Sequence, residues 1–279
     1  MKQLSTGVAN SVTVRAEYPN EKGMLVKILN VISKSGGDMA AIDVVSIGKN
    51  TMTRDITINT SGNDHSQLII DSISKMNNVR IINVSDQTFL LHLGGKIEMK
   101  SRSPITTRDD MSKAYTPGVG RISQKIHDDP ESVWALTSKS RTVSIITDGT
   151  AVLGLGDIGP QAALPVMEGK AMLLKEFGGV DAWPLCLDTK DPDKIIEIVK
   201  AISPGFGGII LEDISAPRCF YIEKKLKEDL NIPVFHDDQH GTAIIVLAAL
   251  INSLKVIQKK AKDLKVVILG VGAAGTACA

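Results

Sequence analysis

The sequence predicts an α/β protein in which a small βαββαβ unit precedes a larger domain with a largely parallel sheet. Two observations predict this fold class. The apolar residues change period in a fixed order along the chain, from the alternation typical of strands to the wider spacing typical of helices. A polar, glycine-containing stretch at 94–105 divides the 279 residues into two regions, which fits about two domains.

The first region has its strands and helices in the order of a ferredoxin-like unit. Alternation places Val12, Val14 and Ala16 on one face of a first strand. The helical spacing that follows stops at two glycines, 36–37. We expect strands at 11–19, 41–47, 53–60 and 79–85 and helices at 21–37 and 64–76.

The second region alternates short apolar strands with helices, which predicts a mainly parallel sheet. Functional side chains of such sheets gather where the strands end at their carboxyl edge. We expect strands at 142–147, 207–213 and 232–238 and helices at 161–177, 191–202 and 216–230. The predicted domains are an N-terminal unit at 1–93, a main domain at 94–262 and the start of a third domain at 263–279.

Composition argues against several classes of partner. The chain has 32 basic and 31 acidic residues and a net charge of +1, so no global field favours nucleic acid or an anionic membrane. Its three cysteines have no paired spacing, which favours a reducing cytosol. The longest apolar run, at 243–251, is nine residues, well short of the ~20 that span a bilayer. We expect a soluble, cytoplasmic protein.

Pairs of acidic residues end two of the predicted strands. Glu212 and Asp213 end one, and Asp237 and Asp238 end the other. Adjacent carboxylates converge only where a strand turns into a loop, and side by side the two pairs form an all-oxygen pocket suited to Mg²⁺ or Mn²⁺. For a single pair, helix capping or solvent exposure is the ordinary interpretation. Two pairs in matched positions favour the metal.

Two histidines, His236 and His240, flank the second acidic pair. They raise the alternative of a transition-metal site. Imidazole ligation favours softer partners than carboxylates, so we favour a structural or polar-network role for both.

A lysine lies inside the apolar stripe of the helix predicted at 161–177. Lys170 shares that stripe, whereas Lys175 falls outside it. One interpretation is a snorkelling stem or a buried ion pair. The other is an amine desolvated in a pocket, kept neutral by burial and a nearby cation, and usable as a base. The apolar members of the stripe are Ala163, Val166, Met167, Leu173, Leu174 and Phe177.

One of the three tyrosines, Tyr115, precedes a turn made by Pro117 and Gly118. Such a turn can present a phenol to a cleft. A tyrosine taken alone is more often a core or surface aromatic residue.

Two glycine patterns of the form G-x-G-x-x-G occur. The first interrupts its strand with turn residues and is followed at once by Pro160, so it carries no nucleotide prediction. The second follows the apolar run 266–269 and leads into small residues, as in a dinucleotide-binding turn. Its glycines, the predicted cofactor contacts, are Gly270, Gly272 and Gly275.

Six motifs occur in the order "AYTPGVG", "TDGTAVLGLGDIGP", "MEGKAMLLKEF", "LEDISAP", "FHDDQHGTA" and "VVILGVGAAG". Together, from residue 97 to 279, they resemble the malic enzyme family of the compact bacterial and archaeal type. The preceding unit, on the segment "YPNEKGMLVKILNVIS", resembles an ACT domain, a module that senses small ligands.

The resemblance implies oxidative decarboxylation of (S)-malate to pyruvate and CO₂, with NAD⁺ or NADP⁺ and with Mg²⁺ or Mn²⁺. It also implies an amino-acid-like effector at the ACT-like unit and a homodimer or larger homo-oligomer. Carried onto this sequence, it gives Tyr115 as general acid, Lys170 as general base, Asp237 beside the base, and Glu212, Asp213 and Asp238 as metal ligands.

The sequence departs from the resemblance at one motif, and two rival functions stay open. Larger members have an arginine after "TDG" that binds the substrate carboxylate, where this chain has Thr150 and Ala151. The cofactor domain follows the substrate domain in this family, so a chain ending at Ala279 is expected to hold only its first strand and turn.

The rival functions are a non-catalytic ligand-sensing module and a metal-dependent oxaloacetate decarboxylase without redox turnover. The retained site residues argue against the non-catalytic module.

Overall fold

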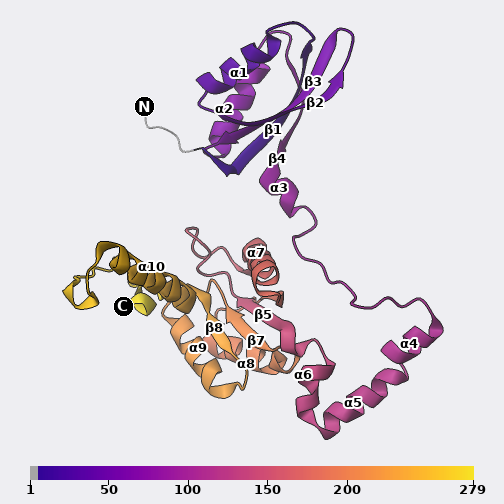
Figure 1. Cartoon of the computed structure of the whole chain (residues 1–279), viewed down its shortest axis with the longest axis vertical. Coiled ribbons are helices and arrows are strands. Elements are labelled where there is room, and N and C mark those ends of the chain that lie inside the picture. The colour runs from indigo at the N-terminus through magenta and orange to yellow at the C-terminus, as the bar shows by residue number, and fades with distance from the viewer. Residues whose placement is uncertain (1–5) are drawn as a thin grey trace. The chain divides into compact units, whose positions relative to one another are not determined.

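The computed structural model describes residues 6–279, which divide into two compact units, 6–95 and 96–279 (Figure 1). The first unit has the expected order of strands and helices. Its four strands form an antiparallel sheet in the order β2-β3-β1-β4. Its elements are β1 (Gly7–Pro19), α1 (Met24–Lys34), β2 (Asp38–Ile47), β3 (Thr51–Thr60), α2 (Asn63–Ser74), β4 (Arg80–Asp86) and α3 (Gln87–His92).

Alternation in β1 builds the core of this unit. Val14 and Ala16 are fully buried against α1 and α2, as the period of two predicts. Arg15, between them, faces the other side of the sheet, where its guanidinium pairs with Asp55 of β3 at 2.8 Å. Strand β1 therefore contributes an apolar face to the core and carries this ion pair on its other face.

The second unit contains a four-stranded sheet in the order β6-β5-β7-β8, and all of its pairings are parallel, as predicted. The sequence had not indicated β6. Its helices are α4 (Arg108–Ala114), α5 (Gly118–Asp128), α6 (Val133–Leu136), α7 (Pro160–Gly178), α8 (Pro192–Ile202), α9 (Arg218–Asp229), α10 (Thr242–Ile257) and α11 (Ala273–Cys278). Its strands are β5 (Thr142–Thr147), β6 (Asp181–Cys186), β7 (Gly208–Leu211) and β8 (Val234–His236), and the short turns are η1 (Pro130–Ser132), η2 (Lys139–Arg141), η3 (Ser203–Gly205), η4 (Asp237–Gly241) and η5 (Ala261–Asp263).

Helices cover both faces of this parallel sheet. Ile145 and Ile146 of β5 are adjacent and fully buried, so they point to opposite faces. Ile145 packs with Met167 of α7, and Ile146 packs in the core formed with α8 and α9. Two separate cores therefore meet at the central strand, and the carboxyl ends of the strands are left for the loops.

The apolar stripe predicted for α7 is only partly correct. Ala163 and Met167 are fully buried, as expected. Leu173 is 53% exposed and Phe177 is 87% exposed, whereas Leu174 of the same turn packs against the core with Ile145 and Met167. Leu173 and Phe177 therefore face away from that core.

The strand predicted at the start of a third domain does not form. Residues 264–271 have no regular structure, and Val267 and Leu269 are 82% and 101% exposed. A strand needs a neighbour for its N–H and C=O groups, and within residues 6–279 no strand lies beside this segment.

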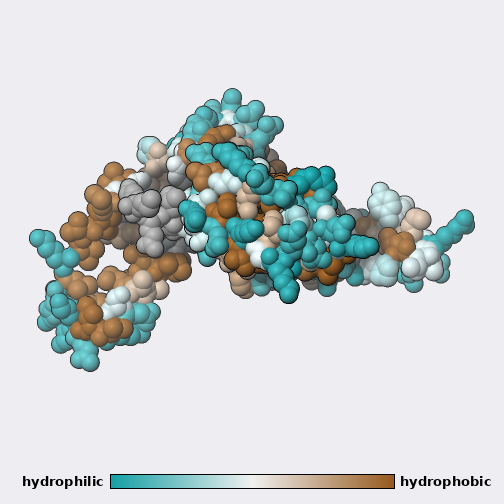
Figure 2. All heavy atoms as spheres, turned by 90° about the horizontal axis from the view of Figure 1, so that it is seen from above, coloured by the Kyte–Doolittle hydropathy of each residue, from teal (hydrophilic) through white to brown (hydrophobic). Residues whose placement is uncertain are grey.

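Helix α10, which follows η4, carries exposed apolar side chains. Ile245 is 70% exposed and Leu247 is 56% exposed, and brown surface appears on the α10 side of Figure 2. Among the described residues one helical segment, Asp237–Ile257, meets the length and hydropathy expected of a membrane span. The core helix of a soluble protein meets the same test, and the expectation of a protein without a membrane partner stays a prediction.

Candidate active site

The predicted site residues lie where the strands of the parallel sheet end. The strand order reverses direction between β5 and β7, and ligands of such sheets bind outside the carboxyl ends at this switch point. Glu212 and Asp213 follow β7, and Asp237 and Asp238 follow β8. Lys170 reaches the same edge from α7.

Three carboxylates converge at this edge. Glu212, Asp213 and Asp238 each offer an oxygen within 4.8 Å of the others. Oδ2 of Asp213 is buried and accepts no hydrogen bond, and Oε2 of Glu212 lies 3.2 Å from Nζ of Lys170 without hydrogen-bond geometry. Buried acceptors without donors are costly, and a hard cation satisfies several at once. The donor set therefore fits Mg²⁺ or Mn²⁺.

The backbone at Asp213 makes this convergence possible. Asp213 has φ +55°, a left-handed conformation that costs a non-glycine residue about 1 kcal/mol or more. Its N–H donates to Oδ2 of Asp238 at 2.9 Å, and its C=O accepts from the N–H of Ala151 at 3.0 Å. These two bonds hold the turn that directs neighbouring carboxylates to one point.

Burial and mutual repulsion raise the pKa values of these acids. Burial, together with the charges of Asp237 and Asp238, raises the pKa of Glu212 to about 8, although Lys170 opposes the shift. Burial and the charge of Asp238 raise the pKa of Asp213 to about 6. Ionising all of these buried carboxylates together is therefore unfavourable, and a positive charge placed among them would be stabilising.

Lys170 is the positive group already present. Its Nζ donates to Oδ2 of Asp237 at 2.5 Å and lies 3.2 Å from Oε2 of Glu212. Burial lowers the pKa of this amine, but the hydrogen bond to Asp237 and the charge of Glu212 outweigh burial, so the pKa of Lys170 lies above its usual value. These contacts match the ion-pair alternative of the sequence analysis, and the neutral amine expected beside a cation stays a prediction.

The turn that carries Asp237 and Asp238 is a single turn of π-helix, η4. Such turns occur mostly inside α-helices and often at functional sites. A Cβ on Gly241, at the end of η4, would overlap the carboxylate of Asp237. Glycine at this position lets Asp237 fold back over the turn toward Lys170.

The two histidines lie in a polar network, and His236 also contacts one of the three carboxylates, with Nε2 3.2 Å from Oδ2 of Asp238. His240 lies with Nε2 2.8 Å from Oε2 of Glu223, a buried acid of α9. His236 is fully buried, with Nδ1 2.8 Å from Nε2 of Gln239. This is the role favoured from the sequence, although periodicity gave no sign of Glu223 as its centre.

Sequence reasoning also missed a buried arginine contact behind the site. Arg218, at the start of α9, pairs with the fully buried carboxylate of Asp148 at 2.7 Å and donates to Oγ1 of Thr150 at 2.5 Å. It also donates to Oγ of Ser215 at 3.1 Å. The arginine thus ties the loop after β5 to the loop after β7. The loops meet only in three dimensions, so spacing along the chain carried no signal.

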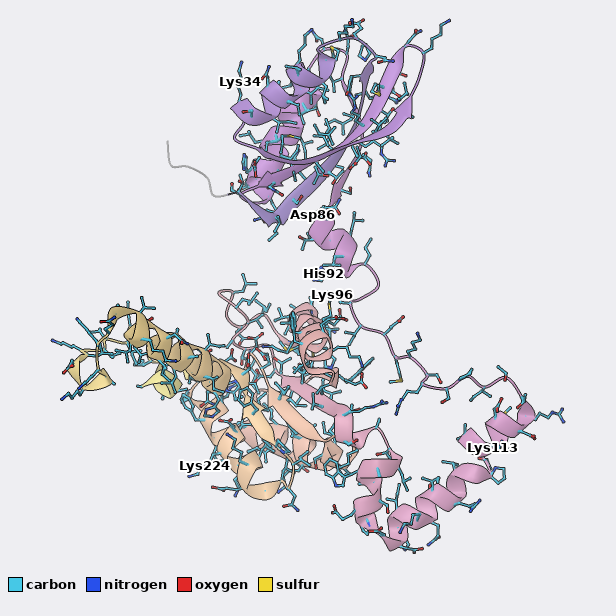
Figure 3. The ribbon with its side chains drawn as sticks, in the orientation of Figure 1. Lys34, Asp86, His92, Lys96, Lys113 and Lys224 are labelled. Atoms are coloured by element: carbon cyan, nitrogen blue, oxygen red, sulfur yellow. The ribbon has the colours of Figure 1, made fainter. Side chains whose placement is uncertain are left out.

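Tyr115 is not brought to this site. It lies between α4 and α5, a segment (residues 108–128) that we call the arm, and it is 68% exposed. The main contacts of α4 and α5 are with each other and with η1. Lys113, labelled in Figure 3, belongs to the same arm. The role of Tyr115 as general acid stays a prediction.

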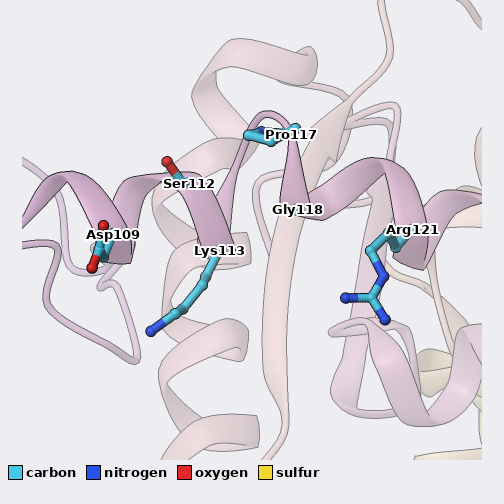
Figure 4. A pocket seen from close by; sticks show the side chains of 6 residues that line it. All are labelled: Asp109, Ser112, Lys113, Pro117, Gly118 and Arg121. Carbon is cyan, nitrogen blue, oxygen red and sulfur yellow. The ribbon is translucent and has the colours of Figure 1, made fainter.

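A pocket of about 420 Å³ lies on the arm (Figure 4). Its lining joins α4 and α5 across the turn at Pro117, and Tyr115 is not part of it. The lining residues are Asp109, Ser112, Lys113, Pro117, Gly118 and Arg121.

The second glycine pattern forms a tight turn even without its strand. Gly270 has φ +115°, and Gly272 immediately precedes α11. A Cβ on Gly275 would overlap the carbonyl oxygen of Gly270, so the third glycine permits close packing as in a dinucleotide turn. Helix α11 packs against η4 and α10, which places this turn next to the acidic cluster. Cofactor binding by these glycines stays a prediction.

We expect the metal-free chain to lose stability as the pH rises from about 5 to about 8. A folded-state pKa above the unfolded value gives stability that is complete below the unfolded pKa and is lost as the pH passes the folded pKa. For Glu212 these limits are 4.5 and about 8. Thermal unfolding in EDTA should therefore show a midpoint that falls across this range, and added Mn²⁺ should raise the midpoint most at pH 8.

Glu212→Gln, which mimics the protonated acid, should reduce this pH dependence. A variant whose midpoint changes with pH as steeply as that of the unsubstituted chain would contradict the assignment to Glu212.

The chain is similar to several malic enzymes. It is 58% identical over 275 residues to an NAD-dependent malic enzyme of Geobacillus stearothermophilus, covering 99% of this chain and 58% of that protein. It is 52% identical over 184 residues to an NADP-dependent malic enzyme of Escherichia coli (strain K12), covering 66% of this chain and 24% of that protein. The chain therefore spans less than two thirds of the length of these relatives.

Solved structures agree with this similarity. The crystal structure of malic enzyme from Pyrococcus horikoshii Ot3 is 53% identical with a TM-score of 0.65, covering 66% of this chain and 42% of that one. An NAD-dependent malic enzyme from Thermotoga maritima is 50% identical with a TM-score of 0.67, covering 70% and 52%. The segment 94–227, which includes Lys170 and the first acidic pair, matches the family described as malic enzyme, N-terminal domain.

Proposed function

We propose that this chain supplies the substrate and metal site for oxidative decarboxylation of (S)-malate to pyruvate and CO₂, with reduction of NAD⁺ or NADP⁺. The observation that carries the proposal is the contact of Lys170 with Asp237 and Glu212 beside a carboxylate cluster in a malic enzyme N-terminal domain. Malate oxidation needs a base next to a cation, and this geometry places an amine beside carboxylates that would hold the cation.

Glu212, Asp213 and Asp238 would hold Mg²⁺ or Mn²⁺. An ion held by these residues would polarise the C2 oxygen and offset the negative charge that remains when CO₂ leaves. Its charge would also favour the neutral amine that a base requires.

Lys170 is the proposed base for the C2 hydroxyl proton. Asp237 accepts a hydrogen bond from Nζ of Lys170 at 2.5 Å and so fixes the direction of the amine. The hydride from C2 goes to the nicotinamide, the bond from C3 to the carboxylate breaks, and the electron pair left at C3 takes a proton. Tyr115 is the proposed donor of that proton.

The two rival functions make different predictions in one assay. An oxaloacetate decarboxylase without redox turnover releases CO₂ from oxaloacetate but reduces no cofactor with malate. A non-catalytic module does neither. The assay follows the absorbance of reduced cofactor in the full-length protein with malate, Mn²⁺ and either NAD⁺ or NADP⁺, and an absence of signal with both cofactors would contradict the proposal.

Lys170→Ala in the full-length protein should lower kcat by about 10²- to 10⁴-fold, the usual contribution of a general base. The matched control is Lys175→Ala on the same helix, because Lys175 is exposed and pairs with Asp181 away from the site. Near-normal kcat in Lys170→Ala would make this lysine structural.

The first unit is proposed to be an ACT-like regulatory domain that binds an amino acid or similar effector. Support comes from its βαββαβ order and from Gly23, which has φ +87° at the turn between β1 and α1. A Cβ at Gly23 would meet open space, so a small ligand can approach the backbone there.

A thermal-shift screen of amino acids against the chain should find at least one that raises the unfolding midpoint. Gly23→Ala should remove that response. Gly36→Ala, at the other end of α1 with φ +84°, carries a similar backbone cost and should keep it. Equal responses in both variants, or none in the unsubstituted chain, would contradict effector binding at Gly23.

We also propose that the chain forms a homodimer or a larger homo-oligomer through the arm. Val119 and Ile122 lie on one side of α5 and are 36% and 39% exposed, and no residue of α4 or α5 is buried. Light scattering should give at least twice the mass of one chain, and Ile122→Glu should shift the mass toward the monomer. The exposed charge change Lys125→Glu is the control, and an unsubstituted chain that is monomeric would contradict the proposal.

A further inference from the structure

Glu223 is a buried acid that has no part in the proposed chemistry. Its side chain, on α9, is nearly inaccessible, and none of its contacts is with Lys170 or the carboxylate cluster. Nζ of Lys227 lies 2.8 Å from Oε1, which also accepts from the N–H of His236 at 3.1 Å. Nε2 of Gln239 donates to Oε2 at 3.2 Å, and Nε2 of His240 lies 2.8 Å from the same oxygen.

Three of these four partners belong to one short segment. His236 ends β8, and Gln239 and His240 lie in η4, the turn that also carries Asp237 and Asp238. Glu223 therefore accepts hydrogen bonds from both sides of the two aspartates. Burial raises the pKa of Glu223, but the bonds from Lys227, His236 and His240 outweigh burial and hold the pKa below its usual value, so the acceptor stays ionised.

The same network fixes the tautomer of His236. Because the amide nitrogen of Gln239 donates to Glu223 and also lies 2.8 Å from Nδ1 of His236, Nδ1 is an acceptor. The ring proton of the neutral imidazole then sits on Nε2. That atom is buried and lies 3.2 Å from Oδ2 of Asp238.

Oδ2 of Asp238 is thus approached from two sides. The N–H of Asp213 donates to it at 2.9 Å, and Nε2 of His236 faces it at 3.2 Å. Groups behind a ligand orient it, and their loss typically weakens metal binding by about 10- to 100-fold. Glu223 sets the position of His236 through its backbone and through Gln239.

We propose that Glu223 is a positioning residue that fixes η4 and the tautomer of His236, and so directs the carboxylates of Asp237 and Asp238. The proposal rests on the metal site described under the proposed function. Burying the ionised carboxylate of Glu223 costs free energy of folding, and the positioning of η4 gives this buried charge a function.

The first test is the Mn²⁺ affinity of the 279-residue chain, measured by calorimetric titration. Glu223→Gln keeps the shape but replaces one acceptor by a donor that faces the existing donors, and it should weaken Mn²⁺ binding by about 10- to 100-fold. Lys225→Met is the control for lost charge. Because Lys225, on the same helix, pairs with Glu228 and Asp229, its loss should leave the affinity unchanged.

A second control separates positioning from general loss of stability. Leu226, three residues after Glu223 on α9, is fully buried in the core. Leu226→Ala should lower the free energy of unfolding by about 2–5 kcal/mol without changing Mn²⁺ affinity. If Leu226→Ala weakens Mn²⁺ binding as much as Glu223→Gln does, or if Glu223→Gln binds within about twofold of the unsubstituted chain, well short of the expected loss, the proposal is overturned.

The second test needs no metal. Nitrogen-15 shifts of the His236 ring should show the proton on Nε2 in the unsubstituted chain and a changed tautomer mixture in Glu223→Gln. A proton on Nδ1 in the unsubstituted chain would overturn the proposal. If that chain shows the Nε2 tautomer but takes up no Mn²⁺, the metal site fails while the network stands, so the two failures are distinguishable.

Discussion

The attraction between the Lys170 amine and the acids around it joins the parts of the larger unit into one site. Lys170 comes from a helix on one face of the sheet, whereas Glu212 and Asp237 come from the ends of two strands. Without this ammonium group the acids would repel one another in a desolvated pocket. The same attraction holds the lysine proton, so the amine becomes a base only when other positive charge reaches the carboxylates.

Unfavourable local geometry is concentrated at this edge and supported from behind. Asp213 is left-handed and η4 is a π-turn, and each departs from regular structure next to a carboxylate of the cluster. Such departures persist where the surrounding structure over-determines them. Here the surrounding contacts are the Arg218 pair with Asp148 and the bonds to Glu223.

Much of the fold and the acidic cluster could be predicted because both are patterns along the chain. Apolar periodicity located the main elements, and acids at the ends of parallel strands must share an edge. Contacts between distant segments could not be read in this way, so Arg218 and Glu223 were missed. The predicted strand at 266–269 failed because apolar composition cannot show whether a neighbouring strand is present. The sequence left the state of Lys170 open between an ion pair and a neutral amine, because the sign of a pKa shift depends on which partners surround the amine.

Because β5 packs into two cores, its register also fixes the position of the loop that follows it at the site. Ile145 belongs to the α7 core and Ile146 to the α8 and α9 core, so a one-residue slip of this strand would put each side chain into the wrong core. The slip would also shift the end of the strand by about 3.3 Å along its axis. Asp148, two residues after Ile146, would then lose its contact with Arg218. The register of one central strand thus sets the alignment of the loops to within a single residue.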